Sequence, residues 1–222
     1  NYHVRGAGGE LILVPFKNDY EDLETLVNVA LKQSAKIIYL SNPDNPMGTA
    51  ISGRKIEEII KEIPEDCILC LDEAYADFST EDFIPRIDAE NPRVVRLRTF
   101  SKAYGLAGAR IGFAVGEKKF IKNFDKIRNH FGVNRVAQVG ALAALRDQNH
   151  LMKIINLVNN AKQRIRKLSV DCGLITIDSQ ANFVAVDCGR DGPYASKVMQ
   201  NLIKRRVFVR MPSVEPLNRC IR

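Results

Sequence analysis

The chain has 222 residues, of which 45% are hydrophobic and 27% are charged. Such a chain can bury the core of one large domain, or of one domain with a smaller neighbour, and its composition excludes a disordered protein. No apolar run reaches the roughly 18 to 20 residues of a membrane span, and the opening residues lack the apolar stretch of a secretory signal. We therefore expect a cytoplasmic globular protein with no membrane partner.

The charge balance is basic, since 33 lysines and arginines against 26 acidic residues give a net charge of +7. Nucleic-acid binding is the weaker interpretation of this excess, because the basic residues are spread along the chain. The two densest runs, 162–167 and 204–206, fall on amphipathic helical patterns whose charged side chains typically face solvent. We expect no nucleic-acid partner, and steeply salt-dependent retention on DNA would indicate one.

The cysteine and histidine positions argue against a disulfide framework and a metal site. The five cysteines are odd in number and scattered, which suits a reducing compartment. Cys67 and Cys70 form a C-x-x-C pair, but residues three apart on a strand point to opposite faces and cannot share a metal. His3, His130 and His150 lie far apart in the sequence. We therefore expect no metal.

Apolar runs alternate with helical patterns through the first half of the chain. Ser52 is a candidate N-cap for a helix whose isoleucines recur at helical spacing and form one stripe. The complete pattern predicts helices at 19–33 and 52–63 and strands at 10–16, 35–43, 67–75, 93–98 and 110–116. Uniformly apolar strands separated by helices are typical of an α/β fold with a mostly parallel sheet and helices on both faces.

After residue 116 the pattern changes. It predicts helices at 117–131, 135–147 and 149–170, strands at 174–177 and 182–187, a helix at 193–206 and strands that begin at 207 and 219. We place a boundary near Gln148, with a large domain over 1–148 and a smaller α+β domain over 149–222. The chain opens in a helical pattern, which the glycine-rich segment "GAGG" (6–9) terminates. It closes in a strand-like run, so we expect the whole protein to continue at both ends.

Polar residues follow three of the predicted strands. The three loops read "SNPDNPMG" (41–48), "DEAYADF" (72–78) and "TFSK" (99–102). Ligands of open α/β sheets bind outside the carboxyl ends of the strands, so these loops are candidates for one common site. Each loop alone also fits an ordinary turn or helix cap, and it is their occurrence in order that favours a function.

Together with "RTFSKAYGLAGARIG" (98–112), these loops resemble the successive motifs of fold-type I, pyridoxal-phosphate-dependent aminotransferases, most of all the histidinol-phosphate aminotransferase branch. The spacing agrees with that branch: Tyr75 lies three positions after Asp72, Lys102 thirty positions after Asp72, and Arg110 eight positions after Lys102. The resemblance implies the fold of a fold-type I transferase, pyridoxal 5'-phosphate as cofactor, an amino donor and a keto acceptor as small-molecule partners, and a homodimer.

The resemblance also implies a role for each matching residue of the cofactor site. Lys102 matches the Schiff-base lysine, which is both covalent anchor and general base. Ser101 and Arg110 match ligands of the cofactor phosphate, for which a bidentate guanidinium is well suited. Asp72 matches the carboxylate that pairs with the pyridine nitrogen. Asn45 and Tyr75 match the pair that binds the ring 3-oxygen.

Two arginines near the end of the chain match substrate ligands of the branch. Arg222 matches the arginine that binds the carboxylate of a glutamate donor, and Arg210 matches one that helps to hold the phosphate of histidinol phosphate; an exposed strand-end charge is the other interpretation of Arg210. The alternatives are an aromatic or other amino-acid aminotransferase, a threonine-phosphate decarboxylase-like enzyme of the same fold, or an inactive scaffold. Met47 and Ala109 depart from the usual threonine and leucine of the motifs.

Overall fold

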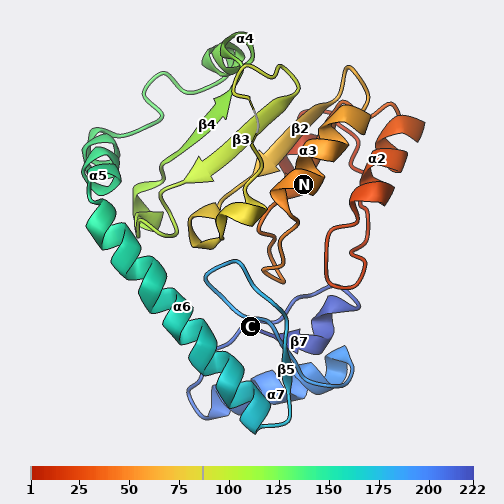
Figure 1. The fold of residues 1–222 in the computed structure, drawn as a ribbon, viewed down its shortest axis with the longest axis vertical. Coiled ribbons are helices and arrows are strands. Elements are labelled where there is room, and N and C mark those ends of the chain that lie inside the picture. Colours follow the sequence, from red (N-terminus) through yellow and green to blue (C-terminus); the bar gives the residue numbers. More distant parts are fainter. Residues whose placement is uncertain (1, 87) are drawn as a thin grey trace.

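The computed structural model describes residues 2–86 and 88–222, and a four-stranded sheet forms its larger part. The strands lie in the order β1 (Ile37–Ser41), β2 (Ile68–Asp72), β3 (Val94–Thr99) and β4 (Gly112–Gly116). The first three are parallel, and β4 runs antiparallel to β3 (Figure 1). The prediction of a mostly parallel sheet in an α/β fold is confirmed.

Two helices cover one face of this sheet, α2 (Leu23–Lys32) and α3 (Gly53–Glu62). Ser52 accepts a hydrogen bond from the Lys55 amide, as expected of the N-cap of α3. The four isoleucines of the predicted stripe are buried against the strands, together with apolar residues of α2 and β1 to β3. This core fixes the carboxyl ends of the parallel strands, where the candidate loops begin.

The opposite face of the sheet has much less helical cover within the described residues. Ile121 of α4 (Lys118–Lys122) lies near Gly116 at the end of β4. On β1, Ile37 and Tyr39 leave 64% and 56% of their surfaces exposed. The helical cover that the sequence predicts for both faces is therefore concentrated on the face that α2 and α3 cover.

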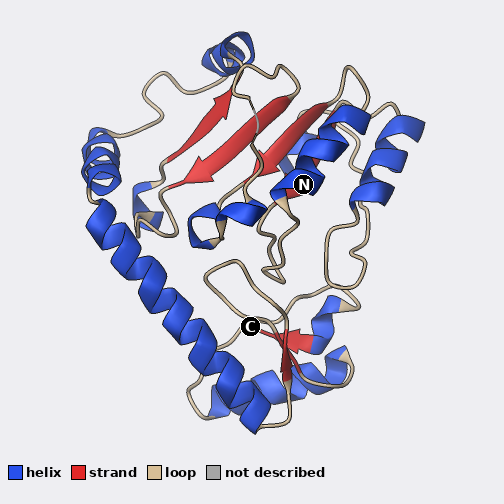
Figure 2. Ribbon diagram, in the orientation of Figure 1, coloured by secondary structure: helices blue, strands red, loops and turns tan. Residues whose placement is uncertain are grey.

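A long helix connects the large sheet to a second, smaller sheet. After α5 (Arg135–Arg146), α6 (Gln148–Asp171) runs along one edge of the molecule to a three-stranded antiparallel sheet packed beside α7 (Gly192–Lys204) (Figure 2). The small sheet contains β5 (Ile175–Thr176), β6 (Val186–Asp187) and β7 (Cys220–Ile221). The domain boundary near Gln148 stays a prediction, at the residue where α6 begins.

The sequence also predicts elements that the structure does not form. Residues 10–16 are irregular rather than a strand, because no described strand pairs with them, and Leu13 is 71% exposed. The helix predicted at 117–131 breaks after α4 into a 3₁₀ turn (Asn123–Lys126) and irregular chain. Residues 207–211 are irregular, although the backbones of Arg210 and Arg222 exchange two hydrogen bonds of 2.8 Å.

The first helix and the remaining 3₁₀ turns are short. Helix α1 (Tyr2–Gly6) ends where Gly8 adopts a positive φ of 79° and the Gly9 amide donates to the Val4 carbonyl, as the glycine cluster predicts. The 3₁₀ turns are η1 (Ala76–Phe78), η2 (Glu81–Phe83), η3 (Ala107–Ala109) and η5 (Leu217–Arg219).

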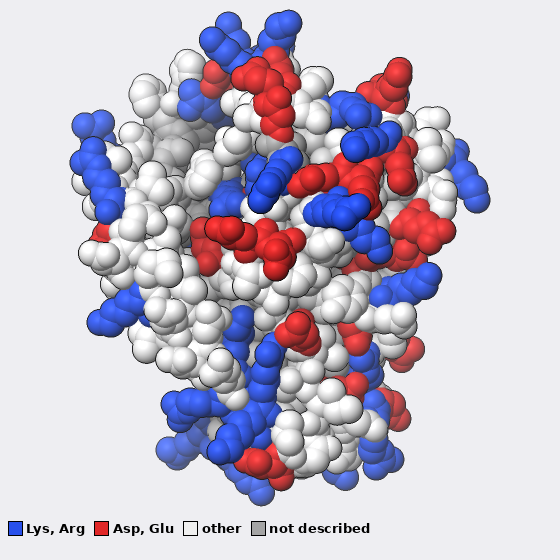
Figure 3. Space-filling view, viewed as in Figure 1, with Lys and Arg blue, Asp and Glu red and all other residues white. Residues whose placement is uncertain are grey.

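Among residues 2–86 and 88–222, no helix combines the length and the apolar character that a membrane-spanning segment needs. On the face drawn in Figure 3, acidic and basic side chains are interspersed over the upper part of the molecule.

Candidate functional site

The carboxyl ends of β2 and β3 meet at a hollow of about 390 Å³. Asp72, the last residue of β2, lines this hollow together with Ser101, Lys102 and Arg110 from the segment that follows β3. Four of the six residues predicted for the cofactor site therefore share one cavity wall. A carboxylate stands among a lysine, an arginine and a hydroxyl, an arrangement that suits a ligand with both a basic nitrogen and an anionic group.

The turn after β3 is built from tight local hydrogen bonds. The Ser101 amide donates to Thr99 Oγ1 at 3.0 Å, and the Gly105 amide donates to the Lys102 carbonyl at 3.0 Å. Gly105 has a φ of 70°, which is open to glycine and strained for most other residues. The chain therefore reverses directly after Lys102, and Lys102 is the first residue of this hydrogen-bonded turn.

Arg110 adopts a left-handed backbone conformation with a φ of 54°. Few residues with a Cβ are found there, and such conformations are concentrated at functional sites. Its Nη1 donates to the Ala107 carbonyl at 2.8 Å, which leaves the rest of the guanidinium beside the hollow. The strained backbone thus presents a cation on the same wall as Ser101.

The loop between β1 and α3 holds Asn45 through buried neighbours. Asn42 is 1% exposed and bonds three backbone groups: its Nδ2 donates to the carbonyls of Ile51 and Phe83, and its Oδ1 accepts from the Ile51 amide. Asp44 accepts from Thr49 Oγ1 at 3.1 Å. Because both polar side chains are satisfied inside the loop, Asn45 has a defined position at its tip.

Asn45 and Tyr75 lie together at the second part of the site. Asn45 Nδ2 donates to the Tyr75 hydroxyl at 3.3 Å, and Asn45 Oδ1 accepts from Arg222 Nη1 at 2.7 Å. Lys102 Nζ lies 5.0 Å from the centre of the Tyr75 ring. Tyr75 thus connects this group to the residues that line the hollow.

Phe183 is a site residue that the sequence analysis did not single out. Its ring is nearly perpendicular to the ring of Tyr75 at a centroid distance of 5.3 Å, and the Arg222 guanidinium lies 4.6 Å from the centre of the Phe183 ring. Cation–π contact and aromatic packing together fix the direction of Arg222. Phe183 stands in the segment "ANFV" (181–184), and the sequence alone does not show which side chains this phenylalanine contacts.

The structure brings the two predicted substrate arginines side by side through their backbones. Arg210 and Arg222 form a pair of reciprocal hydrogen bonds although they are twelve residues apart. Burial lowers the pKa of Arg222, and the positive charge of Arg210 adds to this effect. Two neighbouring guanidinium groups repel each other, so an anion between them would be bound favourably.

A buried acidic group lies behind Asp72. Glu21 Oε1 accepts from the Ser41 amide at 3.3 Å, while its buried Oε2 has no hydrogen-bond partner among the described residues. Burial, with smaller contributions from the carboxylates of Asp44 and Asp72, raises the pKa of Glu21 to about 8. Burial also raises the pKa of Asp44 to about 6. Glu21 is therefore protonated at neutral pH.

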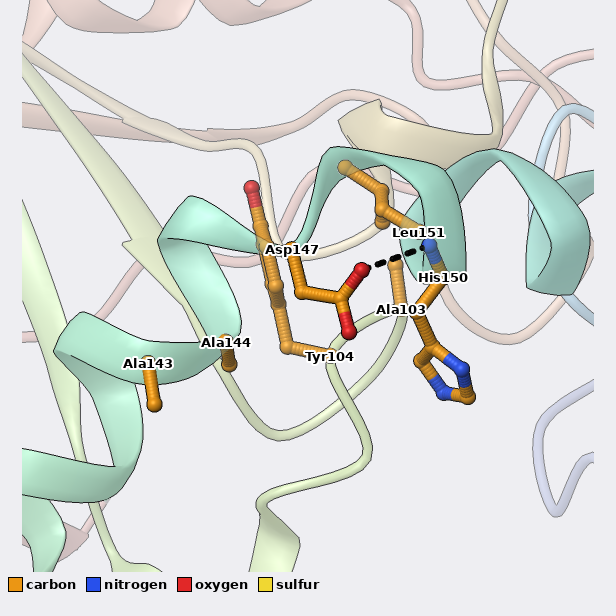
Figure 4. Close-up of a pocket in the computed structure, with 7 residues that line it drawn as sticks. All are labelled: Ala103, Tyr104, Ala143, Ala144, Asp147, His150 and Leu151. Carbon is orange, nitrogen blue, oxygen red and sulfur yellow. Dashed lines mark hydrogen bonds between the residues drawn. The ribbon is translucent and has the colours of Figure 1, made fainter.

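A second hollow, of about 190 Å³, lies on the other side of the Lys102 turn, between Ala103, Tyr104 and the junction of α5 and α6 (Figure 4). Its acidic residue, Asp147, accepts a hydrogen bond of 3.0 Å from the His150 amide and so caps α6. Because the Asp147 carboxylate is the N-cap of α6, we assign no chemistry to the second hollow.

Comparison with known proteins decides the family. The family model described as aminotransferase class I and II matches residues 2–222. This chain belongs to the class I and II aminotransferases. It is 38% identical over 210 residues to histidinol-phosphate aminotransferase 2 of Hydrogenovibrio crunogenus. It is 34% identical over 207 residues to histidinol-phosphate aminotransferase of Moorella thermoacetica.

A solved structure agrees with this assignment. The histidinol-phosphate aminotransferase of Sinorhizobium meliloti, in complex with pyridoxal-5'-phosphate, is 46% identical with a TM-score of 0.94. The alignment covers 99% of this aminotransferase-family chain and 61% of the solved chain. The alignment with the Hydrogenovibrio crunogenus protein covers 93% of this chain and 55% of that relative, and the alignment with the Moorella thermoacetica protein covers 91% and 53%. The chain therefore spans about half the length of these two relatives.

The buried acid Glu21 gives a pH-dependent prediction. Between its ordinary pKa of 4.5 and its folded pKa of about 8, the folded state holds a proton that the unfolded state has lost, so stability falls as the pH rises through this window. We expect Glu21→Gln to raise the free energy of unfolding at pH 8 by about 2–4 kcal/mol and to change it little near pH 4. Urea denaturation at several pH values measures this.

Glu24→Gln, at an exposed position of α2, is the matched control and should not reproduce the pH-dependent gain. Parallel stability curves for Glu21→Gln and the unmodified protein from pH 5 to 8 would contradict the assignment of a neutral Glu21.

Proposed function

We propose that the protein containing this chain is a pyridoxal-phosphate-dependent aminotransferase that moves an amino group between glutamate and the ketone related to histidinol phosphate. The observation that carries the proposal is the single hollow lined by Asp72, Ser101, Lys102 and Arg110. Its support from relatives is that a 46% identical solved protein binds this cofactor.

The residues of the hollow fit the cofactor. A pyridine nitrogen needs a carboxylate to stay protonated, an aldehyde needs a lysine amine, and a phosphate needs an arginine and hydroxyl donors; Asp72, Lys102, Arg110 and Ser101 supply these groups. When bound, pyridoxal phosphate supplies an electron sink for the carbanion formed at the substrate Cα.

Different side chains of the protein bind the cofactor and transfer the proton. Asp72 holds positive charge at one end of the hollow, and Arg110 with Ser101 anchors the anionic end. Lys102 would be the covalent anchor, and its freed amine would act as general base, taking the proton from the substrate Cα and delivering it to C4′ of the cofactor. Asn45 and Tyr75, whose side chains are hydrogen-bonded at 3.3 Å, would be the donors to the ring oxygen of the cofactor.

The two arginines define the substrate side of the proposal. Arg222, held by Asn45 and Phe183, is placed to bind a substrate carboxylate beside the reacting centre. Arg210, exposed and adjacent to it, is placed to bind a second anionic group such as a phosphate. Aromatic amino-acid transamination and phosphoamino-acid decarboxylation are the alternatives that substrate assays separate.

We further infer a cytoplasmic homodimer. Five free cysteines suit a reducing compartment. The dimer is what the family resemblance implies, with sites near the subunit interface. Light scattering of the active whole protein should give twice the monomer mass; an active monomer would refute it.

The covalent role of Lys102 is tested by chemical labelling. Borohydride reduction of the whole protein with bound cofactor, followed by peptide mapping, should place the pyridoxyl group on Lys102. Lys102→Ala should abolish amino transfer, because the anchor and the base are lost together. Lys55→Ala, exposed on α3, is the control and should keep full activity. Labelling at another lysine would overturn the assignment.

Arg210 provides the substrate test. Arg210→Ala removes a charge-assisted pair to the phosphate, typically 1.5–3 kcal/mol, so the KM for histidinol phosphate should rise about 10- to 150-fold while the KM for glutamate stays nearly constant. Arg205→Ala, exposed at the end of α7, is the control.

Equal changes in both KM values would contradict the assignment of Arg210 to the phosphate. If 2-oxoglutarate were aminated no faster by histidinol phosphate than by phenylalanine, the proposed substrate would be wrong.

A further inference from the structure

Tyr39 contacts Asp72 from the neighbouring strand. The register of the parallel pair sets Ser41 of β1 opposite Asp72 of β2, and Tyr39, two residues before Ser41, lies on the same face. From there the Tyr39 hydroxyl donates a hydrogen bond to Asp72 Oδ2. Strand pairing therefore brings a phenol to a carboxylate that lies 33 residues away in the sequence.

Both oxygens of the Asp72 carboxylate are held. Oδ1 accepts from the Ala74 amide at 2.9 Å, and Oδ2 accepts from Tyr39. A carboxylate oxygen has more than one acceptor site, so these bonds leave capacity for a ligand in the hollow. With a donor on each oxygen, rotation about the Cβ–Cγ bond of Asp72 is restricted, and its orientation toward the hollow is set before any ligand arrives.

Acidic side chains surround the Tyr39 hydroxyl. Burial and the hydrogen bond to Asp72 raise the pKa of Tyr39, and the carboxyl groups of Asp72 and Glu21 add smaller contributions. The Tyr39 hydroxyl therefore stays protonated and donates to Asp72 Oδ2.

We propose that Tyr39 is a positioning residue for Asp72: its hydroxyl holds the carboxylate oriented for the cofactor nitrogen. This inference rests on the proposed function, in which Asp72 pairs with that nitrogen. Tyr39 acts through Asp72, so removal of its hydroxyl weakens cofactor binding and lowers kcat while the KM for glutamate changes little, because the substrate arginines are untouched.

A double-mutant cycle tests the coupling in the whole protein. The dissociation constant of pyridoxal phosphate is measured for the unmodified protein, Tyr39→Phe, Asp72→Asn and the double variant. We expect Tyr39→Phe to weaken binding about tenfold when Asp72 is present, as for the loss of a hydrogen bond to a charged group. In the Asp72→Asn background the same change should have less than about a twofold effect.

Tyr194→Phe, at a partly exposed tyrosine of α7, makes the same chemical change away from Asp72 and should leave the dissociation constant unchanged. An unchanged constant for Tyr39→Phe, or equal weakening with and without Asp72, overturns the inference while the proposed function stands. An unchanged constant for Asp72→Asn overturns the proposed role of Asp72, and the inference with it.

Discussion

A buried ion-pair cluster holds the ends of the two strands that carry the site. Glu73 is 1% exposed, and its carboxylate accepts from Arg96 at 2.5 and 3.0 Å and from Arg98 at 2.9 Å. Asp72 immediately precedes Glu73, and Lys102 follows Arg98 by four residues. Breaking a buried pair leaves an uncompensated charge at a cost of about 3–5 kcal/mol, so the cluster keeps the carboxylate and the lysine on one wall.

Local sequence rules predicted the elements that local contacts form. The Ser52 cap and the isoleucine stripe of α3 both occur, because a helix needs only its own residues and one apolar surface to pack on. The strand at 10–16 fails for the opposite reason: a strand needs a partner, and a short apolar run does not show whether it has one. The parallel pairing of β1 and β2 follows from the α3 crossover between them, whereas the described elements between β2 and β3 are the 3₁₀ turns η1 and η2.

The site was predictable where a motif defines it and unpredictable where only packing does. The resemblance of the strand-end motifs to a known family implied Asn45, Asp72, Tyr75 and Lys102, and the structure brings these residues together at the strand ends. Tyr39 and Phe183 reach the site from other segments. The contact of Tyr39 depends on the register between β1 and β2, and the contacts of Phe183 depend on how the small sheet packs near the large one. A local sequence pattern predicts neither of these arrangements.

The proposed function requires that Asp72, Lys102 and Arg110 hold one cofactor molecule in a preformed hollow. A crystal structure of the whole protein with pyridoxal phosphate tests this requirement most directly. We expect continuous density from Lys102 Nζ to the cofactor, the pyridine nitrogen within hydrogen-bonding distance of Asp72, and the phosphate on Ser101 and Arg110. Cofactor density attached to another lysine, or a pyridine nitrogen without a contact to Asp72, would contradict it.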